Sequence, residues 1–314
     1  MMQPLTSINL YDVIIIGSGP AGFTAAIYAS RSRLKTLLIA GRRWGGQLMF
    51  TAEVENFPGF PEGVSGAELV ENLRRQARRF DTETVFEDAT AVDFAEPPFT
   101  ISMGDHAVKG RSVIVATGSS PKLLGLESEA RLLGRGVATC ATCDAPLYAD
   151  KKTAVIGGGD SALDEALALA KFAEAVVVIH RRDALRATQV LQERAYAHDK
   201  IRFLWDTVVQ EIVGTEKAEG LRLKNVKTGE ESEMAVDGVF IAIGYTPNTS
   251  LFQGALDLTA SGHIRTHDET QTSVAGVFAA GDAKDPTYHQ AITAAGDGCK
   301  AALDAEAYLL HQQS

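Results

Sequence analysis

Near its start the chain reads Tyr11-Asp-Val-Ile-Ile-Ile-Gly17-Ser-Gly19-Pro-Ala-Gly22, an apolar run that leads into spaced glycines. The run predicts a buried parallel strand, and the next stretch, Phe23-Thr-Ala-Ala-Ile-Tyr-Ala29, predicts a helix. Gly17 would permit a tight turn, Gly19 would let a pyrophosphate approach the backbone, and Gly22 would let helix and strand pack closely. The stretch therefore predicts a Rossmann-like α/β domain that binds a dinucleotide.

The same pattern returns at Thr153-Ala-Val-Ile-Gly157-Gly-Gly159-Asp-Ser-Ala162, where alanine is small enough for the third glycine position. A helical stretch, Leu163 to Phe172, follows it, and the next strand, Ala175 to Ile179, ends in His180-Arg181-Arg182-Asp183. Arg186 comes one helical turn later. Arginines at this strand end suit the 2′-phosphate of NADP, where an acidic residue would select NAD; a surface basic cluster is the alternative. The pattern predicts a second, related domain that binds NADPH.

The first glycine motif departs from the general fingerprint at the end of its second strand. That strand, Thr36 to Ile39, is followed by Ala40-Gly41-Arg42-Arg43, where an acidic residue usually holds a ribose hydroxyl. The two arginines form either a solvated corner or a phosphate contact. A distant strand ends in Gly281-Asp282, whose carboxylate can bind the hydroxyls of a flavin's sugar chain; a simple turn aspartate is the alternative.

The order of these motifs predicts an inserted domain. If the first glycine motif and Gly281-Asp282 build one site, the second domain must interrupt the first. Two strands that end in loop residues, at 113–121 and 241–248, mark the crossings. We therefore expect an α/β fold of two Rossmann-like three-layer nucleotide-binding domains. Residues 122–247 would form the inserted domain, residues 1–121 and 248–314 the other, and the double crossing a hinge.

Between the two glycine motifs lies Cys140-Ala-Thr-Cys143, followed at once by Asp144. Two sulfurs at this spacing can close a disulfide on one helical turn or share a metal, and a helix N-terminus favours the reactive thiolate. A structural zinc site usually needs four ligands, and Cys299 stands alone, so we expect redox chemistry; a metal site and a chance buried pair are the alternatives. Asp144 is either a cap or an acid/base group whose pKa is raised by burial.

Composition bounds the class of protein. The 314 residues are 45% hydrophobic and 22% charged, as in a globular protein with room for two domains. A net charge of −10 argues against a nucleic-acid surface. Three cysteines with one redox-spaced pair suit the cytoplasm. Residues 1–10 lack the pattern of a signal peptide, and no stretch reaches the ~18 apolar residues of a membrane helix, so we expect no membrane anchor.

Taken together, these motifs resemble the bacterial-type, low-molecular-weight thioredoxin reductases over essentially the full length of the chain. The matching segments are Gly-Ser-Gly-Pro-Ala-Gly at 17–22, Gly-Gly-Gln-Leu at 45–48, Glu-Val-Glu-Asn-Phe-Pro-Gly at 53–59, Ala-Thr-Gly at 116–118, Cys-Ala-Thr-Cys-Asp at 140–144, Gly-Gly-Gly-Asp-Ser-Ala at 157–162, His-Arg-Arg-Asp at 180–183 and Gln-Ala-Ile-Thr-Ala-Ala-Gly at 290–296.

The resemblance implies a homodimeric FAD enzyme that carries electrons from NADPH, through the flavin and the Cys140–Cys143 disulfide, to oxidised thioredoxin. Cys143 would be the thiol next to the flavin, Cys140 the thiol that attacks the protein substrate, and Asp144 the acid/base. Rotation about the two crossings would alternate between flavin reduction and exposure of Cys140. No metal is expected.

The expected cofactor sites combine the glycine motifs with positions that the resemblance supplies. The residues expected to bind FAD are Gly17, Gly19, Pro20, Ala21, Gly22, Gln47, Asn56, Thr117, Gly118, Gly281, Asp282, Gln290 and Ala291. The residues expected to bind NADPH are Gly157, Gly159, Asp160, Ser161, Ala162, His180, Arg181, Arg182 and Arg186.

Several positions leave alternatives open. His289 stands where the family commonly has arginine and Asp297 where a small or neutral residue is common; they either tune the flavin or are neutral. Cys299 is either a buried helix residue or a third redox thiol. The arginine-rich stretch from Glu68 to Phe80 is either a solvated helix face or a dock for an acidic partner.

Three other functions are alternatives to the thioredoxin reductase that the resemblance implies. Relatives that take electrons from ferredoxin, or that oxidise a small dithiol, would not need the arginines at 181–186. A non-catalytic redox sensor would share the fold without turnover. Tightly bound zinc without flavin colour would favour the sensor.

Overall fold

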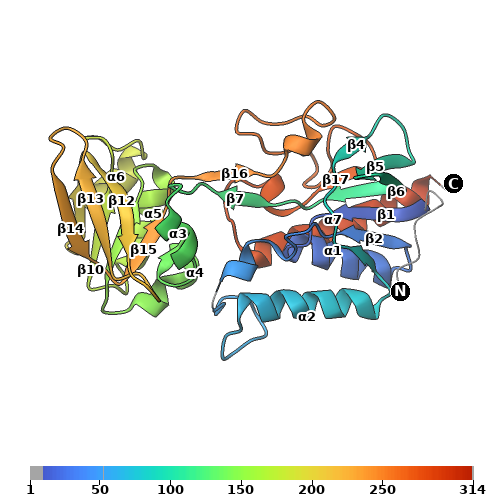
Figure 1. The fold of residues 1–314 in the computed structure, drawn as a ribbon. Coiled ribbons are helices and arrows are strands. Elements are labelled where there is room, and N and C mark those ends of the chain that lie inside the picture. Colours follow the sequence, from blue (N-terminus) through green and yellow to red (C-terminus); the bar gives the residue numbers. More distant parts are fainter. Residues whose placement is uncertain (1–9, 52, 313–314) are drawn as a thin grey trace. The chain divides into compact units, whose positions relative to one another are not determined.

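A computed structural model describes residues 10–51 and 53–312, and its contacts divide the chain into two compact units (Figure 1). The first unit comprises Met1–Thr51, Phe57–Ser120 and Thr246–Ser314, and the second comprises Ala52–Asn56 and Pro121–Tyr245. The second unit thus interrupts the first in sequence. Each unit has its own sheet and its own hydrophobic core.

The first unit is built on a sheet that combines parallel and antiparallel pairs. Its order is β3-β2-β1-β6-β5-β4, and β17 also pairs with β6. The five strands β1, β2, β3, β6 and β17 are parallel, whereas β4, β5 and β6 pair antiparallel. The bounds are β1 Leu10–Ile16, β2 Thr36–Ile39, β3 Glu83–Val85, β4 Ala91–Asp93, β5 Phe99–Met103, β6 His106–Val115 and β17 Val277–Ala279.

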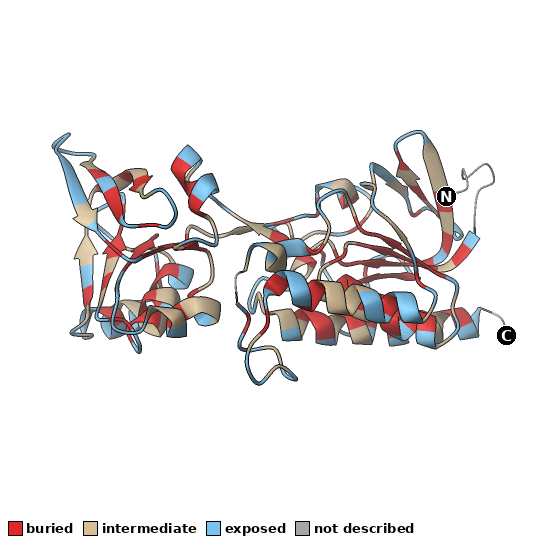
Figure 2. Cartoon of the chain, turned by 60° about the horizontal axis from the view of Figure 1, so that its bottom comes forward, coloured by how far each residue is buried: buried red, intermediate tan, exposed pale blue. Residues whose placement is uncertain are grey.

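Alternate residues of β1 pack into two different cores, because successive side chains of a strand point to opposite faces. Val13 and Ile15 pack with helices α1 (Pro20–Arg31) and α7 (Ala291–His311), whereas Ile14 and Ile16 pack on the other face with Phe99 and Phe252. Figure 2 shows these strands and the inner helix faces as buried. Both faces of β1 are covered, which explains its continuous apolar run.

Further short elements complete the first unit. Helix α2 packs on α1, and Ser65 caps its N-terminus by accepting a hydrogen bond from the Glu68 amide at 3.2 Å. The bounds are α2 Gly66–Arg79 and, for the 3-10 turns, η1 Gly46–Phe50, η3 Ser250–Phe252 and η4 Gly281–Ala283. None of the helices within residues 10–51 and 53–312 has the length and apolarity that a bilayer crossing demands.

The second unit has three layers. Its central parallel sheet has the order β11-β10-β9-β15-β8, and a separate antiparallel sheet has the order β12-β13-β14. Val155 and Phe240 face the helices, whereas Ile156 and Ile241 face the antiparallel sheet. The bounds are α3 Glu127–Leu132, β8 Val137–Ala138, α4 Ala141–Asp144, η2 Ala145–Tyr148, β9 Lys152–Ile156, α5 Asp160–Leu169, β10 Ala175–Ile179, α6 Gln189–Tyr196, β11 Ile201–Leu204, β12 Thr207–Val213, β13 Gly220–Asn225, β14 Glu231–Ala235 and β15 Gly238–Ile241.

Two short strands carry the chain between the units. They are β7 (Ser119–Pro121) and β16 (Tyr245–Pro247), and they pair as a two-stranded sheet. The amide of Lys122 donates to the carbonyl of Gly244 at 2.8 Å, which extends the pairing. Each crossing is thereby hydrogen-bonded to the other.

Candidate redox and nucleotide sites

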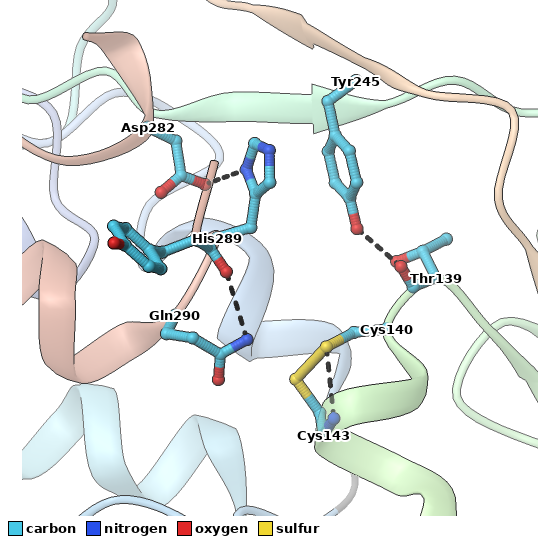
Figure 3. Close-up of a disulfide and its surroundings, with 8 residues drawn as sticks. Thr139, Cys140, Cys143, Tyr245, Asp282, His289 and Gln290 are labelled. Atoms are coloured by element: carbon cyan, nitrogen blue, oxygen red, sulfur yellow. Dashed lines mark hydrogen bonds and ion pairs between the residues drawn. A yellow bond between two sulfur atoms is a disulfide. The ribbon is translucent and has the colours of Figure 1, made fainter. Parts of the chain in front are cut away.

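Cys140 and Cys143 form a disulfide at the start of α4, as their spacing predicted, with their Cα atoms 5.4 Å apart (Figure 3). Cys140 occupies the N-cap position, and the amide of Cys143 donates to the Cys140 sulfur at 3.2 Å. An amide that points at this sulfur favours its negative form once the disulfide is reduced. The geometry therefore suits Cys140 as the attacking thiolate.

Asp144 ends the same helical turn. Burial raises the pKa of its carboxyl to about 6, as the acid/base interpretation requires. Tyr148 lies in the following turn, η2, and burial together with the charges of Asp144 and Asp237 raises the pKa of its phenol to about 12. Of these two groups, Asp144 is the one that can exchange a proton near neutral pH.

Two further residues near the disulfide were missed from the sequence. The hydroxyl of Tyr245, in β16, donates to the carbonyl oxygen of Thr139 at 2.5 Å, immediately before Cys140 (Figure 3). Glu165, on α5, has a buried carboxylate oxygen, Oε2, with no hydrogen-bond partner among the described residues. No local signal marked Tyr245, whereas Glu165 could have been noticed as an acidic residue on an apolar helix stripe.

The second glycine loop leaves room for a phosphate group. Gly159 is the N-cap of α5 and carries no side-chain cap; a Cβ atom placed there would meet no described atom within 4 Å. Free amides at a helix N-terminus attract anions. Asp160 and Ser161 open the helix, with Asp160 accepting a hydrogen bond from the Thr188 amide at 2.7 Å, and Ala162 packs in the core.

The three predicted arginines lie close to this loop in the fold. The side chains of Arg181, Arg182 and Arg186 are exposed and form no ion pair within the described part of the chain. The amide of Arg186 donates to the carbonyl of Gly158 at 2.7 Å, which ties that segment to the loop. Unpaired guanidinium groups beside an open helix N-terminus fit a phosphorylated ribose.

His180 differs from the arginines that follow it. Its ring is buried against Gly158, and its Nε2 atom has no partner among the residues that the structure describes. Burial lowers the pKa of the imidazole. A hydrogen bond with the Ala184 backbone raises this pKa, whereas the positive charges of the nearby arginines lower it further. The His180 side chain is therefore neutral, and it packs against the second glycine loop at Gly158.

The first glycine loop has the geometry that its three glycines predicted. A Cβ atom on Gly17, which has φ +113°, would overlap the carbonyl oxygen of Ala116, and one on Gly22 would overlap the carbonyl oxygen of Gly17. A Cβ atom on Gly19 would meet no described atom within 4 Å. Pro20 is the first residue of α1, with Ala21 buried after it. The loop fits a dinucleotide.

A polar group forms at the end of β17. The Asp282 carboxylate oxygen Oδ2 accepts a hydrogen bond from the Ser119 hydroxyl at 3.1 Å and lies 3.1 Å from His289 Nδ1 (Figure 3). Burial would lower the pKa of His289, but the hydrogen bond and charge of Asp282, together with Asp285 and the Pro286 carbonyl, raise it. The group thus pairs one carboxylate with a readily protonated imidazole.

Asp297 has two partners inside the first unit. Its Oδ2 atom lies 3.1 Å from Lys284 Nζ and accepts a hydrogen bond from the amide of Gly281 at 3.2 Å. Both ionic side chains are largely buried, at 12% and 14% exposed. The departure from the family's usual residue is therefore accommodated by a local ion pair.

The remaining residues expected at the FAD site lie on loops and at helix ends. Gln47 donates to the Ser119 carbonyl at 3.3 Å, and Thr117 donates to the Asn248 carbonyl at 2.7 Å. The carbonyl of Gly118 accepts a hydrogen bond from the Asn248 amide. Gln290 is the N-cap of α7, and Ala291 is the first residue of that helix. Asn56 is exposed and lies in a segment that is grouped with the second unit.

The structure adds detail at three positions that the sequence left open. The Arg42 side chain is 80% exposed and lies 3.9 Å from Asp88, as expected of a solvated corner. Glu71 pairs with Arg74 and with Arg75 on α2, as on a solvated helix face. Cys299 lies on α7, as expected of a helix residue, but is only partly buried, and its thiol interacts with the Tyr28 phenol.

A metal site receives no support from the geometry. No cluster of histidine, cysteine, aspartate and glutamate in the described residues could hold a metal ion. The two sulfurs are joined to one another instead.

Comparison with known proteins gives consistent results. A family model described as pyridine nucleotide-disulphide oxidoreductase matches residues 11–298. A protein from Streptomyces coelicolor named thioredoxin reductase is 52% identical, over 96% of this chain and 94% of its own. A protein from Pseudomonas fluorescens named glucosaminate ammonia-lyase is 49% identical, over 95% of each.

Solved structures show the same fold. The crystal structure of a thioredoxin reductase from Streptococcus pyogenes superposes with a TM-score of 0.92 at 40% identity, over 97% of this chain and all of the other. The predicted fold class is thereby confirmed.

Proposed function

The chain belongs to the pyridine nucleotide-disulphide oxidoreductase family, and from that premise we propose that it is a thioredoxin-disulfide reductase, an oxidoreductase that draws electrons from NADPH through FAD. The observation that carries the proposal is the Cys140–Cys143 disulfide at the N-terminus of α4, in the same unit as a glycine loop with unpaired arginines. A binding protein would not require a reversible disulfide in that place.

The two units would divide the cofactors between them. We assign FAD to residues 1–121 and 248–314 and NADPH to residues 122–247. Support for FAD comes from the open backbone at Gly19 and from the Asp282 carboxylate at a strand end. Support for NADPH over NADH comes from the exposed arginines at 181, 182 and 186.

FAD, when bound, supplies the reducing equivalents that it takes from NADPH. The chain's own residues then perform a thiol–disulfide exchange in which two electrons and two protons pass to the substrate. The Cys140 thiolate attacks one sulfur of the thioredoxin disulfide, and the other sulfur leaves. Cys143 then attacks Cys140 to reform the internal disulfide and release the second substrate thiol. Asp144 would take protons from the enzyme's thiols and give them to the leaving thiolates, because its pKa near 6 permits both.

Assembly and location follow from the resemblance. We propose a cytoplasmic homodimer in which the inserted unit alternates between presenting its nicotinamide site and presenting Cys143 to the flavin. A single redox-spaced cysteine pair suits a reducing compartment. The two paired crossings, β7 and β16, would be the hinge.

An anaerobic absorbance titration tests this proposal. Purified protein would be titrated with NADPH and then mixed with oxidised thioredoxin. We expect bleaching of the flavin by NADPH and its recovery with thioredoxin. A flavin that NADPH cannot bleach would favour the ferredoxin-linked or dithiol-oxidase relatives, and zinc without flavin would favour a sensor.

A further inference from the structure

Glu165 lies on the inner side of α5 with its carboxylate oxygen Oε2 buried, although glutamate rarely buries its carboxylate without a partner. Ala162, Ala166 and Leu169 are fully buried in one core cluster, and Glu165 shares their helix face because residues three and four apart lie on the same side. Asp164, its neighbour in sequence, is exposed instead. The helix thus directs a carboxyl group toward the core of the second unit.

The helix that packs on this face of α5 is α4, which carries the redox motif. Ala141 and Ala145, which flank Asp144 in sequence, belong to the same buried cluster as Ala162 and Ala166, so that α4 packs directly on this face of α5. The two carboxyl groups, those of Asp144 and Glu165, therefore come from facing helices.

The surroundings of Glu165 offer little to neutralise it. Its Oε2 atom is buried and accepts no hydrogen bond from any described residue. The charges that act on it are those of Asp144 and Asp164, both negative; η2 contributes Tyr148, and Arg194 of α6 acts on Asp164. The core cluster on this face of α5 also contains valines of β9 and β10. Burial is the largest cause, and with these charges it raises the pKa of Glu165 to about 8.

We propose that Glu165 is a positioning residue for Asp144: the two form a coupled pair that carries at most one negative charge at neutral pH, with Glu165 keeping its proton while Asp144 exchanges its own. One negative carboxylate near the reduced cysteines still allows a thiolate to form, whereas two negative carboxylates would oppose the formation of that thiolate. This inference rests on the acid/base role that the proposed function gives to Asp144.

Infrared titration of the oxidised protein tests the pair without NADPH or thioredoxin. The wild type should lose two buried protonated-carboxyl signals as the pH rises, one near 6 and one near 8. Glu165→Gln should lose the upper signal only. Asp144→Asn should lose the lower signal and move the upper one down by roughly one pH unit, since the charge of Asp144 is removed.

Reactivity of the reduced protein gives a second readout. Alkylation of Cys140 by iodoacetamide should be about threefold to tenfold faster at pH 9 in Glu165→Gln than in the wild type, because the second charge never forms. Glu174→Gln, an exposed carboxyl in the same unit, is the matched control and should follow the wild type.

Failure of this inference can be told apart from failure of the proposed function. If Glu165→Gln keeps both infrared signals, or if its alkylation profile overlays the wild type, the pair does not exist, even in a protein that reduces thioredoxin normally. If Glu165→Gln does not fold, the Asp144→Asn shift decides: an unmoved upper signal would overturn the coupling.

Discussion

His289 Nδ1 lies 3.1 Å from Asp282 Oδ2, and the two side chains are only 19% and 21% exposed. Asp282 follows β17 and is expected to bind the flavin's sugar chain, so this pair joins an expected cofactor residue to a histidine that stands where arginine is common in the family. A partly buried pair of this kind is sensitive to pH, because the two side chains attract one another as opposite charges only while the imidazole is protonated.

Replacement of this histidine should change how stability depends on pH. The pKa of His289 is raised in the folded protein. The pair therefore contributes fully to the free energy of unfolding below about pH 6.5, and this contribution is lost as the pH rises through the folded pKa. In flavin-free protein, His289→Gln should cost about 1 kcal/mol at pH 5.5 and nearly nothing at pH 9. Urea unfolding at both pH values measures it. His198→Gln, whose partner Asp199 is 92% exposed, should show no such difference.

Alanine substitutions at two neighbouring glycines should affect different properties, one the stability of the fold and the other the binding of FAD. Gly22→Ala should destabilise the first unit by several kcal/mol, because its Cβ would overlap the Gly17 carbonyl. Gly19→Ala should fold normally but bind FAD at least tenfold more weakly, because the added methyl group would occupy the open approach to the backbone. Thermal unfolding of flavin-free protein and FAD titration separate the two. Equal losses of stability would contradict this account of the loop.

The arginines at 181, 182 and 186 should set the preference for NADPH. Each single Arg→Ala change should raise the KM for NADPH by about 10- to 100-fold, the loss of one charge-assisted bond to phosphate, and should leave the KM for NADH nearly unchanged. Steady-state kinetics with both nucleotides provides the measurement. Arg202→Ala, an exposed arginine on β11, is the control. Parallel rises for both nucleotides would instead indicate general damage to the unit.

The two cysteines should separate two half-reactions. Cys140→Ser should keep NADPH-driven reduction of the flavin and abolish reduction of thioredoxin, because the attacking thiol is gone. Stopped-flow absorbance follows the first step and a thioredoxin-coupled thiol assay the second. Normal turnover by this variant would show that Cys140 is not the attacking residue.

Asp144→Asn should stabilise the protein while it impairs catalysis. A buried carboxyl whose pKa rises from its ordinary value near 4 to about 6 destabilises the folded state as the pH rises through that window, by on the order of 3 kcal/mol. The variant should therefore unfold at higher temperature at pH 7, match the wild type near pH 4, and reduce thioredoxin at least tenfold more slowly. Asp150→Asn, an exposed change in the same unit, should alter neither property. A variant that loses stability at pH 7 would contradict burial as the cause.

Sequence patterns determined the parts that depend on residues close together in the chain. The spacing of Gly17, Gly19 and Gly22 specifies one strand–turn–helix geometry, since a side chain at Gly17 or Gly22 would overlap the backbone and Gly19 leaves the backbone open to a ligand. The spacing of Cys140 and Cys143 likewise specifies a disulfide on one turn. From these local patterns the fold class and the redox chemistry could be predicted.

Only the tertiary structure decided contacts between distant residues and the chemistry that they create. Ser119 meets Asp282 across 163 positions, and Tyr245 meets Thr139 across 106. Burial cannot be read from residue type: His180 is buried whereas the next residue, Arg181, is exposed. The raised pKa of Asp144 and that of Glu165 arise because two helices pack face to face and exclude water, a condition that no local pattern encodes.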